Sequence, residues 1–233
     1  MRFVVKGAEP ACLTQVRREV DRIVDDSGQG LTTADWSELK DCAQPVRDAL
    51  AFEQAHLCAY CMGRLRTTGH HDVTNPYGMK IEHFVPRSMQ PAQMFQWSNL
   101  LGVCSGRTVI QQGTHDTCDR VRGNRPLHIN PARRPPDPAA CFSYRRDGTI
   151  VGLSPEAHDD IVTLNLNADP LRNARAAAIA HVQKELRRDD TVANLRRLHR
   201  QASSPNTSGE LPPYAGAVAA YITKKLRARG VET

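Results

Sequence analysis

The chain has 233 residues, of which 40% are hydrophobic and 5% aromatic, and it carries a formal net charge of +6 with a pI near 9.1. It has no run of about 18 apolar residues, which excludes a membrane-spanning helix, and its first residues lack the apolar stretch of a secretory signal. We expect a cytoplasmic protein with a modest core, no membrane partner and, from its charge, a polyanionic partner.

The first 52 residues are predicted to be helical. Apolar residues at helical spacing predict a helix over 11–26, which ends at the glycine-containing stretch 27–30. A second helix is expected after Thr32-Thr33, with Thr33 as its cap, and Pro45 is expected to break it in two. We assign residues 1–52 as an N-terminal helical segment and a candidate docking surface for a partner.

Residues 53–152 are predicted to form a separate core of short strands and loops. In chain order we expect a loop over 66–79, strands over 80–85 and 99–103, an insertion over 105–117, a short helix over 118–124 and a hairpin over 142–151. The adjacent His70 and His71 fall in the polar loop, where a solvated loop is favoured over a metal site.

The C-terminal region, 153–233, is predicted to be helical. Asn167 or Asp169 is expected to cap a helix that has Pro170 in its first turn and an apolar stripe from Leu171 to Leu186. We expect further helices over 191–200 and 214–229, separated by a break over 203–213.

Four cysteines are spaced as zinc ligands. Cys58-x2-Cys61 places two thiolates on one tight turn, and Cys104 and Cys118 supply the second half if the thirteen residues between them loop out and return. His115 is an alternative fourth ligand, although Cys104 is favoured because it ends the second predicted strand. With four protein ligands and no open position, such a zinc ion would be structural.

The other three cysteines do not fit this pattern. Seven cysteines in a chain of this kind argue against a disulfide framework and for metal binding by some of them. We therefore interpret Cys12, Cys42 and Cys141 as ordinary small core residues.

An acid–histidine pair lies between the two halves of the zinc pattern. A histidine can take a proton from water at neutral pH, and carboxylates can hold a hard divalent cation. Glu82 and His83 are neighbours on a predicted strand, so their side chains point to opposite faces unless the strand bends near Pro86. Asp119, directly after the last zinc cysteine, would complete a cation site with Glu82.

Four segments together resemble a known nuclease family. They are Cys-Ala-Tyr-Cys (58–61), Ile-Glu-His-Phe-Val-Pro-Arg-Ser (81–88), Trp-Ser-Asn-Leu-Leu (97–101) and Cys-Asp-Arg-Val-Arg-Gly-Asn (118–124). They resemble an HNH endonuclease with the ββα-metal fold, and in particular the HNH subunit of Septu and retron-associated anti-phage systems, the PtuB-like family. Weaker similarity extends over 127–131, 144–150 and 164–167, so the resemblance spans about residues 50 to 190.

The resemblance implies a fold and a set of roles. The fold is mainly helical α+β, in which a ββα-metal core with a zinc knuckle is flanked by N- and C-terminal helices. His83 would be the general base, Glu82 and Asp119 the ligands of a catalytic Mg²⁺ or Mn²⁺, and Asn99 would hold the loop that orients His83. Two features depart from the family: Asp119 stands where His or Asn is usual, and the Cys104–Cys118 spacing is long.

From their positions after the strand and on or after the short helix, Arg87, Arg120, Arg122 and Arg125 are candidate phosphate contacts. No base-reading element is evident, which favours weak sequence specificity. The substrate and partner follow from the resemblance. We expect a nuclease acting on DNA in antiviral defence, with an ABC/SMC-like ATPase partner (PtuA-like), since this chain has no ATP-binding loop of its own. The alternatives are an RNA- or tRNA-directed nuclease and a non-catalytic zinc adaptor.

Overall fold

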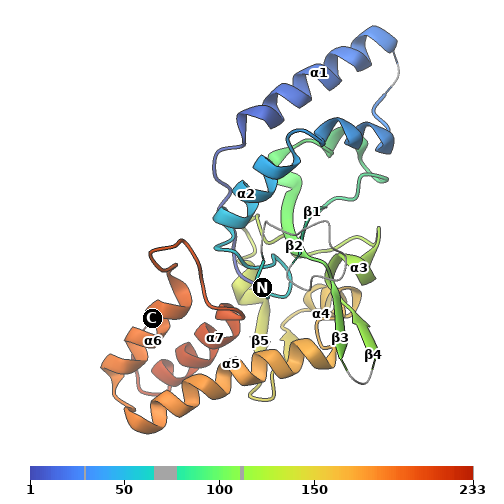
Figure 1. Cartoon of the computed structure of the whole chain (residues 1–233). Helices are drawn as coiled ribbons and strands as arrows, with labels where there is room; N and C mark the ends of the chain where they lie inside the picture. The colour runs from blue at the N-terminus through green and yellow to red at the C-terminus, as the bar shows by residue number, and fades with distance from the viewer. Residues whose placement is uncertain (29, 66–77, 111–112, 233) are drawn as a thin grey trace.

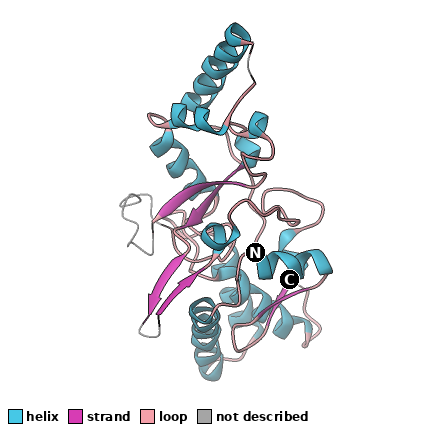
Figure 2. Cartoon of the chain, turned by 90° about the vertical axis from the view of Figure 1, so that its right-hand side faces the viewer, coloured by secondary structure: helices cyan, strands magenta, loops and turns pink. Residues whose placement is uncertain are grey.

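A computed structural model describes residues 1–28, 30–65, 78–110 and 113–232 (Figure 1). Within these residues the fold is mainly helical, and its strands form three two-stranded antiparallel sheets (Figure 2). This agrees with the expected mainly helical α+β class. No helix in the described ranges is long and apolar enough to cross a membrane. Residues 66–77 of the predicted loop, with His70 and His71, lie outside the described residues.

The N-terminal segment contains helix α1 (Ala11–Ser27), the 3-10 helix η1 (Thr33–Leu39) and helix α2 (Ala43–Glu53). Thr32, and not Thr33, caps η1, and its backbone N–H donates to Asp35 over 2.7 Å. The predicted break falls before Pro45, which lies in the first turn of α2, where its missing N–H has no intrahelical acceptor.

The prediction for Cys12 and Cys42 is wrong. The two residues form a disulfide that joins α1 to the residue preceding α2, with their Cα atoms 5.7 Å apart. The sequence does not reveal this pairing, because the two cysteines are 30 residues apart and come together only when α1 packs against η1.

The central sheet pairs β1 (Met79–His83) with β2 (Leu100–Cys104), with Met79 opposite Cys104 and His83 opposite Leu100. The 3-10 helices η2 (Pro91–Gln93) and η3 (Trp97–Asn99) lie in the connection. The expected insertion is a second hairpin, β3 (Arg107–Ile110) and β4 (Gly113–Asp116), which returns the chain to helix α3 (Cys118–Arg122).

The C-terminal half contains η4 (Pro138–Cys141), the hairpin β5 (Phe142–Tyr144) and β6 (Ile150–Gly152), and helices α4 (Pro155–Thr163), α5 (Asp169–Arg188), α6 (Val192–Ser203) and α7 (Ala215–Arg227). Helix α5 runs along one end of the molecule, with α6 and α7 packed beside it (Figure 1). These three helices share a small hydrophobic core, whereas the main core extends from Met1 to Leu171.

The predicted cap of α5 is also wrong. Its N-cap residue is Ala168, which provides no side-chain hydrogen bond. Asn167 instead binds the backbone of Ile150, accepting from its N–H over 2.9 Å and donating to its carbonyl over 2.9 Å. Asparagine here fastens β6 to the start of α5, which a local capping rule does not anticipate.

Gln54 joins α2 to the central sheet. Its amide is buried, accepts from the N–H of Gly102 over 2.7 Å and donates to the Gly102 carbonyl over 2.7 Å and to the Leu57 carbonyl over 2.8 Å. A Cβ at Gly102 would lie 2.4 Å from Cε of Met79 and 3.1 Å from Nε2 of Gln54, so a larger residue here would require both side chains to shift.

We expect Gln54→Ala to lower the free energy of unfolding by about 1–3 kcal/mol, because it leaves buried backbone groups of β2 without partners. Urea unfolding of the zinc-loaded protein measures the change. Gln15→Ala on the exposed face of α1 is the control, with an expected change within about 0.5 kcal/mol. Equal effects of the two substitutions would contradict the role of Gln54.

Candidate metal centre and acid–histidine site

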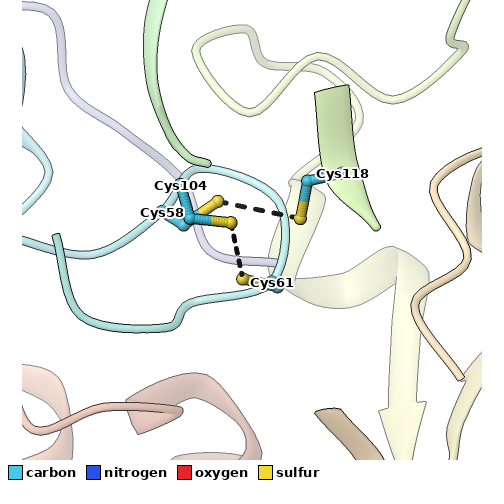
Figure 3. A group of neighbouring side chains, drawn as sticks. All are labelled: Cys58, Cys61, Cys104 and Cys118. Carbon is cyan, nitrogen blue, oxygen red and sulfur yellow. Dashed lines mark hydrogen bonds between the residues drawn. The ribbon is translucent and has the colours of Figure 1, made fainter. Parts of the chain in front are cut away.

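The four predicted cysteines lie together. The sulfur atoms of Cys58, Cys61, Cys104 and Cys118 all lie within 4.8 Å of one another (Figure 3). Two come from the turn after α2, one from the end of β2 and one from the first residue of α3. His115 is carried away on the β3–β4 hairpin and is not in the group, so Cys104 is the fourth member.

The spacing of these sulfur atoms fits a zinc ion. Cys58 and Cys118 are 4.0 Å apart and Cys61 and Cys104 are 3.9 Å apart, measured between their Sγ atoms. A tetrahedral site with Zn–S bonds of about 2.3 Å has sulfur atoms about 3.8 Å apart. In the part of the chain that the structure describes, this is the one group of three or more His, Cys, Asp or Glu residues placed to hold a metal.

The backbone of the turn at residues 58–63 holds the thiols of Cys58 and Cys61 close together. The N–H of Gly63 donates to Sγ of Cys61 over 3.3 Å, and the N–H of Cys58 donates to the Gly63 carbonyl over 2.8 Å. Met62 between them has a φ of 63°, which closes the turn. Burial raises the pKa of Cys58, but hydrogen bonds from the neighbouring thiols outweigh it and hold the pKa well below the usual value. The cluster thus has the ligands of a structural zinc site.

Glu82 leaves β1 on the side facing α3, where it is 7% exposed. The hydroxyl of Tyr60 donates to its carboxylate over 3.1 Å, and the guanidinium of Arg122 forms a buried ion pair with it. Tyr60 lies within the first cysteine pair, so the same turn that provides two thiols also positions Glu82. We did not anticipate Tyr60 from the sequence, although its place between Cys58 and Cys61 is a usable signal.

Arg122 does not fit the expectation of a phosphate contact, because it is 2% exposed and points inward. Besides Glu82 and Tyr60, its guanidinium donates to the carbonyls of His83 over 3.0 Å and Phe84 over 2.6 Å. These contacts consume its donors and fasten α3 to β1. A basic residue on a short helix looks exposed in the sequence, and only the tertiary fold turns it inward.

The two predicted cation ligands lie close together. The negative charge of Asp119 acts on the carboxyl of Glu82, and Asp119 also pairs with the ammonium of Lys80 over 2.9 Å. Burial first, and then the negative charge of Asp119, raises the pKa of Glu82 to about 8, against the opposing effect of Arg122. Lys80 was also missed, although strand alternation places it on the same face as Glu82.

His83 leaves the strand in another direction and contacts other groups. Its Nε2 lies 2.9 Å from the Met94 carbonyl, which can only accept, so Nε2 carries the proton of the neutral ring. Nδ1 is then the basic nitrogen. Burial lowers the pKa of His83 to about 4, against the hydrogen bond to Met94, which raises it. The ring is therefore neutral at pH 7 with a lone pair on Nδ1.

Asn99 makes the kind of contacts expected of a loop-holding residue. Its Oδ1 accepts from the Val85 N–H over 2.8 Å, and its Nδ2 donates to the carbonyls of Val85 over 3.1 Å and Gln93 over 3.2 Å. The side chain thereby fixes both ends of the segment that leads from His83 to Met94. Its role in catalysis stays a prediction.

The remaining predicted arginines lie nearer the surface. Arg87 is half-buried with its guanidinium over the ring of Trp36, Arg120 is exposed and pairs with Asp116, and Arg125 donates to the carbonyls of Val121 and Thr163. Each of these three arginine side chains is partly exposed to solvent. Their contact with phosphate stays a prediction.

We expect Arg122→Met to lower the free energy of unfolding by about 1–3 kcal/mol, because the carboxyl of Glu82 and the carbonyls of His83 and Phe84 would stay buried without their hydrogen-bond donor. Urea unfolding measures the change. Arg120→Met, which removes an exposed ion pair of the same helix, is the matched control, with an expected loss below about 1 kcal/mol. A loss at Arg122 as small as at Arg120 would contradict its structural role.

Comparison of the chain with protein-family models gives no match, and comparison with curated proteins gives none. The geometry alone therefore defines the class: a protein with a four-cysteine site of the structural zinc kind. Beside that site lies a strand with an acid–histidine pair, whose acid faces a second carboxylate from a helix.

Proposed function

We propose that this protein is a metal-dependent endonuclease of the HNH type, which hydrolyses phosphodiester bonds with DNA as its substrate. One observation carries the proposal: a cysteine cluster ties together a strand pair and a helix that bring Glu82 and Asp119 close enough for their charges to interact, on the strand that also carries His83 with its Nε2 bound to the Met94 carbonyl. This is the arrangement expected of a ββα-metal core, although the described residues by themselves define only the cysteine cluster as a metal site.

Zinc has a purely structural part in this proposal. Cys58, Cys61, Cys104 and Cys118 would hold it, and with four thiolates no position stays open for substrate. The cluster fixes the end of β2 and the start of α3, and through them the positions of Leu101, which pairs with Glu82, and of Asp119.

A second, catalytic cation would bind at the carboxylates. Glu82 and Asp119 offer hard oxygen ligands of the kind that Mg²⁺ and Mn²⁺ prefer. When bound, the cation would neutralise charge on the scissile phosphate and the leaving oxygen. The ammonium of Lys80 now pairs with Asp119, so Lys80 must release that carboxylate for the cation to be held.

His83 would then activate water. Because the Met94 carbonyl holds the proton on Nε2, Nδ1 can accept a proton from a water molecule placed in line with the phosphorus atom. Asn99 would serve as a positioning residue, since it holds the loop that carries Met94. Arg87 and Arg120 would add phosphate contacts of the sequence-independent kind.

The proposed biological setting follows from the resemblance. As the HNH subunit of a Septu-like antiviral system, the protein would act together with an ABC/SMC-like ATPase, and the helices at 1–50 and 159–230 would be its docking surfaces. The carboxylates and His83 engage phosphate rather than the 2′-hydroxyl, so RNA stays the alternative substrate.

The substrate class is tested with supercoiled plasmid, single-stranded DNA and a structured RNA, each incubated with the zinc-loaded protein in Mg²⁺, in Mn²⁺ or without added cation. We expect plasmid cleavage that requires the cation and is lost in Asp119→Ala, whereas Asp159→Ala on the exposed face of α4 keeps full activity. Cleavage of RNA alone would assign the RNA-directed alternative, and equal losses in both variants would contradict the site.

A non-catalytic zinc adaptor is the second candidate, and one observation favours it: His83 is only 7% exposed. An adaptor needs no accessible base. It predicts that His83→Ala keeps nucleic-acid or protein binding intact, while Cys61→Ala abolishes folding.

A further inference from the structure

The ring of His83 lies beneath a segment of the N-terminal region. Residues 31–42, which we call the cover, include η1, and Trp36 of η1 contacts His83 edge-to-face with ring centroids 4.5 Å apart. Trp36 also stacks on Phe95, with centroids 5.6 Å apart and ring planes 24° apart. The candidate base is therefore closed off from solvent on this side by a tryptophan from a distant part of the chain.

Only part of the cover packs against the protein: Leu39 and Cys42 are members of the main core, and Leu31 and Trp36 are partly buried against it. Most of its residues are exposed, and Leu39 and Cys42 are its two buried members. One edge is held by Arg87, which donates to the Thr33 carbonyl over 3.4 Å and lies 5.3 Å from the Trp36 ring. Because 3-10 helices are short and their hydrogen bonds have poorer geometry than those of α-helices, the local stability of η1 depends on these contacts and on any covalent tie.

The Cys12–Cys42 disulfide provides that tie. It joins the end of the cover to α1, which itself is anchored to the region of His83 because Arg17 donates to the Phe95 carbonyl over 3.3 Å. The bond closes a loop of 30 residues that contains the whole of η1, and such a closure removes many open conformations of that loop. Cys12 is half-buried and Cys42 is 2% exposed, so Cys12 is the more exposed residue of the pair and the one that we assign as the point of attack by a thiolate.

We propose that the cover is a redox-controlled gate over His83, closed while the Cys12–Cys42 disulfide is intact and free to open when a dithiol reduces it. This inference rests on the proposed function for its consequence, access of substrate to His83, but the opening itself does not depend on it. Where thiols are kept reduced, disulfides are usually transient and redox-sensing, which fits a bond that closes the loop carrying Trp36, the residue that covers His83.

The reaction is a thiol–disulfide exchange. A thiolate of the dithiol attacks Sγ of Cys12, the S–S bond breaks, and Cys42 leaves as a thiolate that takes up a proton. The second thiol of the reductant then displaces Cys12, so the dithiol is oxidised to a disulfide and the protein gains two thiols.

Trp36 itself reports the opening. The chain has two tryptophans, so Trp97→Phe leaves Trp36 as the single tryptophan, which is excited selectively over the five tyrosines. We compare acrylamide quenching of this protein before and after treatment with a phosphine reductant, with zinc content measured in both states. The control adds Cys12→Ser, which cannot form the disulfide. Thiol titration of the denatured protein establishes the starting state, in which the five free cysteines react before reduction and two more react after it.

We expect reduction to increase the quenching constant of Trp36, and the Cys12→Ser protein to be quenched as strongly as the reduced protein in both conditions. Equal quenching before and after reduction would overturn the gate. An increase that also occurs when the Cys12→Ser protein is treated with reductant would overturn it as well, and so would the finding of seven reactive thiols in air-oxidised protein.

In the plasmid assay, reduction should raise the rate of nicking. An unchanged rate in an active protein whose Trp36 becomes accessible would overturn the control of activity. Cleavage in neither state would contradict the proposed nuclease and leave the opening established by fluorescence.

Discussion

Cys61→Ser is expected to release zinc and unfold the core of the protein. Bound structural zinc contributes about 10–16 kcal/mol to folding in small zinc domains, whereas a whole domain is stable by only about 5–15 kcal/mol. The cluster joins the turn after α2, the end of β2 and the first residue of α3, three elements that otherwise share short strands and one five-residue helix. Zinc analysis and circular dichroism of the purified protein measure both effects.

The matched control is Cys141→Ser. Cys141 is a free, half-buried cysteine outside the cluster, so its replacement should leave one zinc per chain and a stability within about 1 kcal/mol of wild type. A folded Cys61→Ser protein that retains zinc would contradict the structural role of the cluster.

His83→Ala is expected to lower the rate of phosphodiester cleavage by about 10²–10⁴, the range that a positioned general base contributes. The reason is geometric: Nε2 is engaged by Met94, so Nδ1 is the nitrogen that takes the proton, and alanine leaves nothing in its place. The rate is measured as single-turnover nicking of supercoiled plasmid with Mg²⁺ or Mn²⁺.

His158→Ala serves as the control for this prediction, because His158 is exposed on α4 and lies outside the site. It should cleave at the wild-type rate. Retained zinc in both variants separates a lost base from a lost fold. If both variants lose activity to the same extent, the assignment of His83 as the base is wrong.

The features that were predictable from the sequence are those encoded over short stretches. The Cys58–Cys61 turn, the two strands around Glu82 and Leu101 and the short helix at Cys118 all follow from local patterns, and the element bounds differ by one or two residues. The choice between Cys104 and His115 needed the fold, which places Cys104 in the cluster at the end of β2 and His115 outside it on the β3–β4 hairpin.

The features that were not predictable depend on contacts between distant residues. Arg122 points inward because it forms an ion pair with Glu82 and hydrogen bonds with two backbone carbonyls. No local rule distinguishes it from an exposed arginine in the sequence. The Cys12–Cys42 disulfide and the contact of Trp36 with His83 likewise join residues 30 or more positions apart. Because of these tertiary contacts, the Glu82–His83 pair that is recognisable in the sequence is buried in the fold, with Trp36 against His83.

The most direct test of the proposed function is plasmid nicking by wild type and His83→Ala side by side, with reductant and Mg²⁺ or Mn²⁺ present and one zinc per chain verified in each protein. The proposal predicts cation-dependent nicking by wild type and a loss of about 10² or more in the variant. Equal cleavage by the two proteins would contradict it.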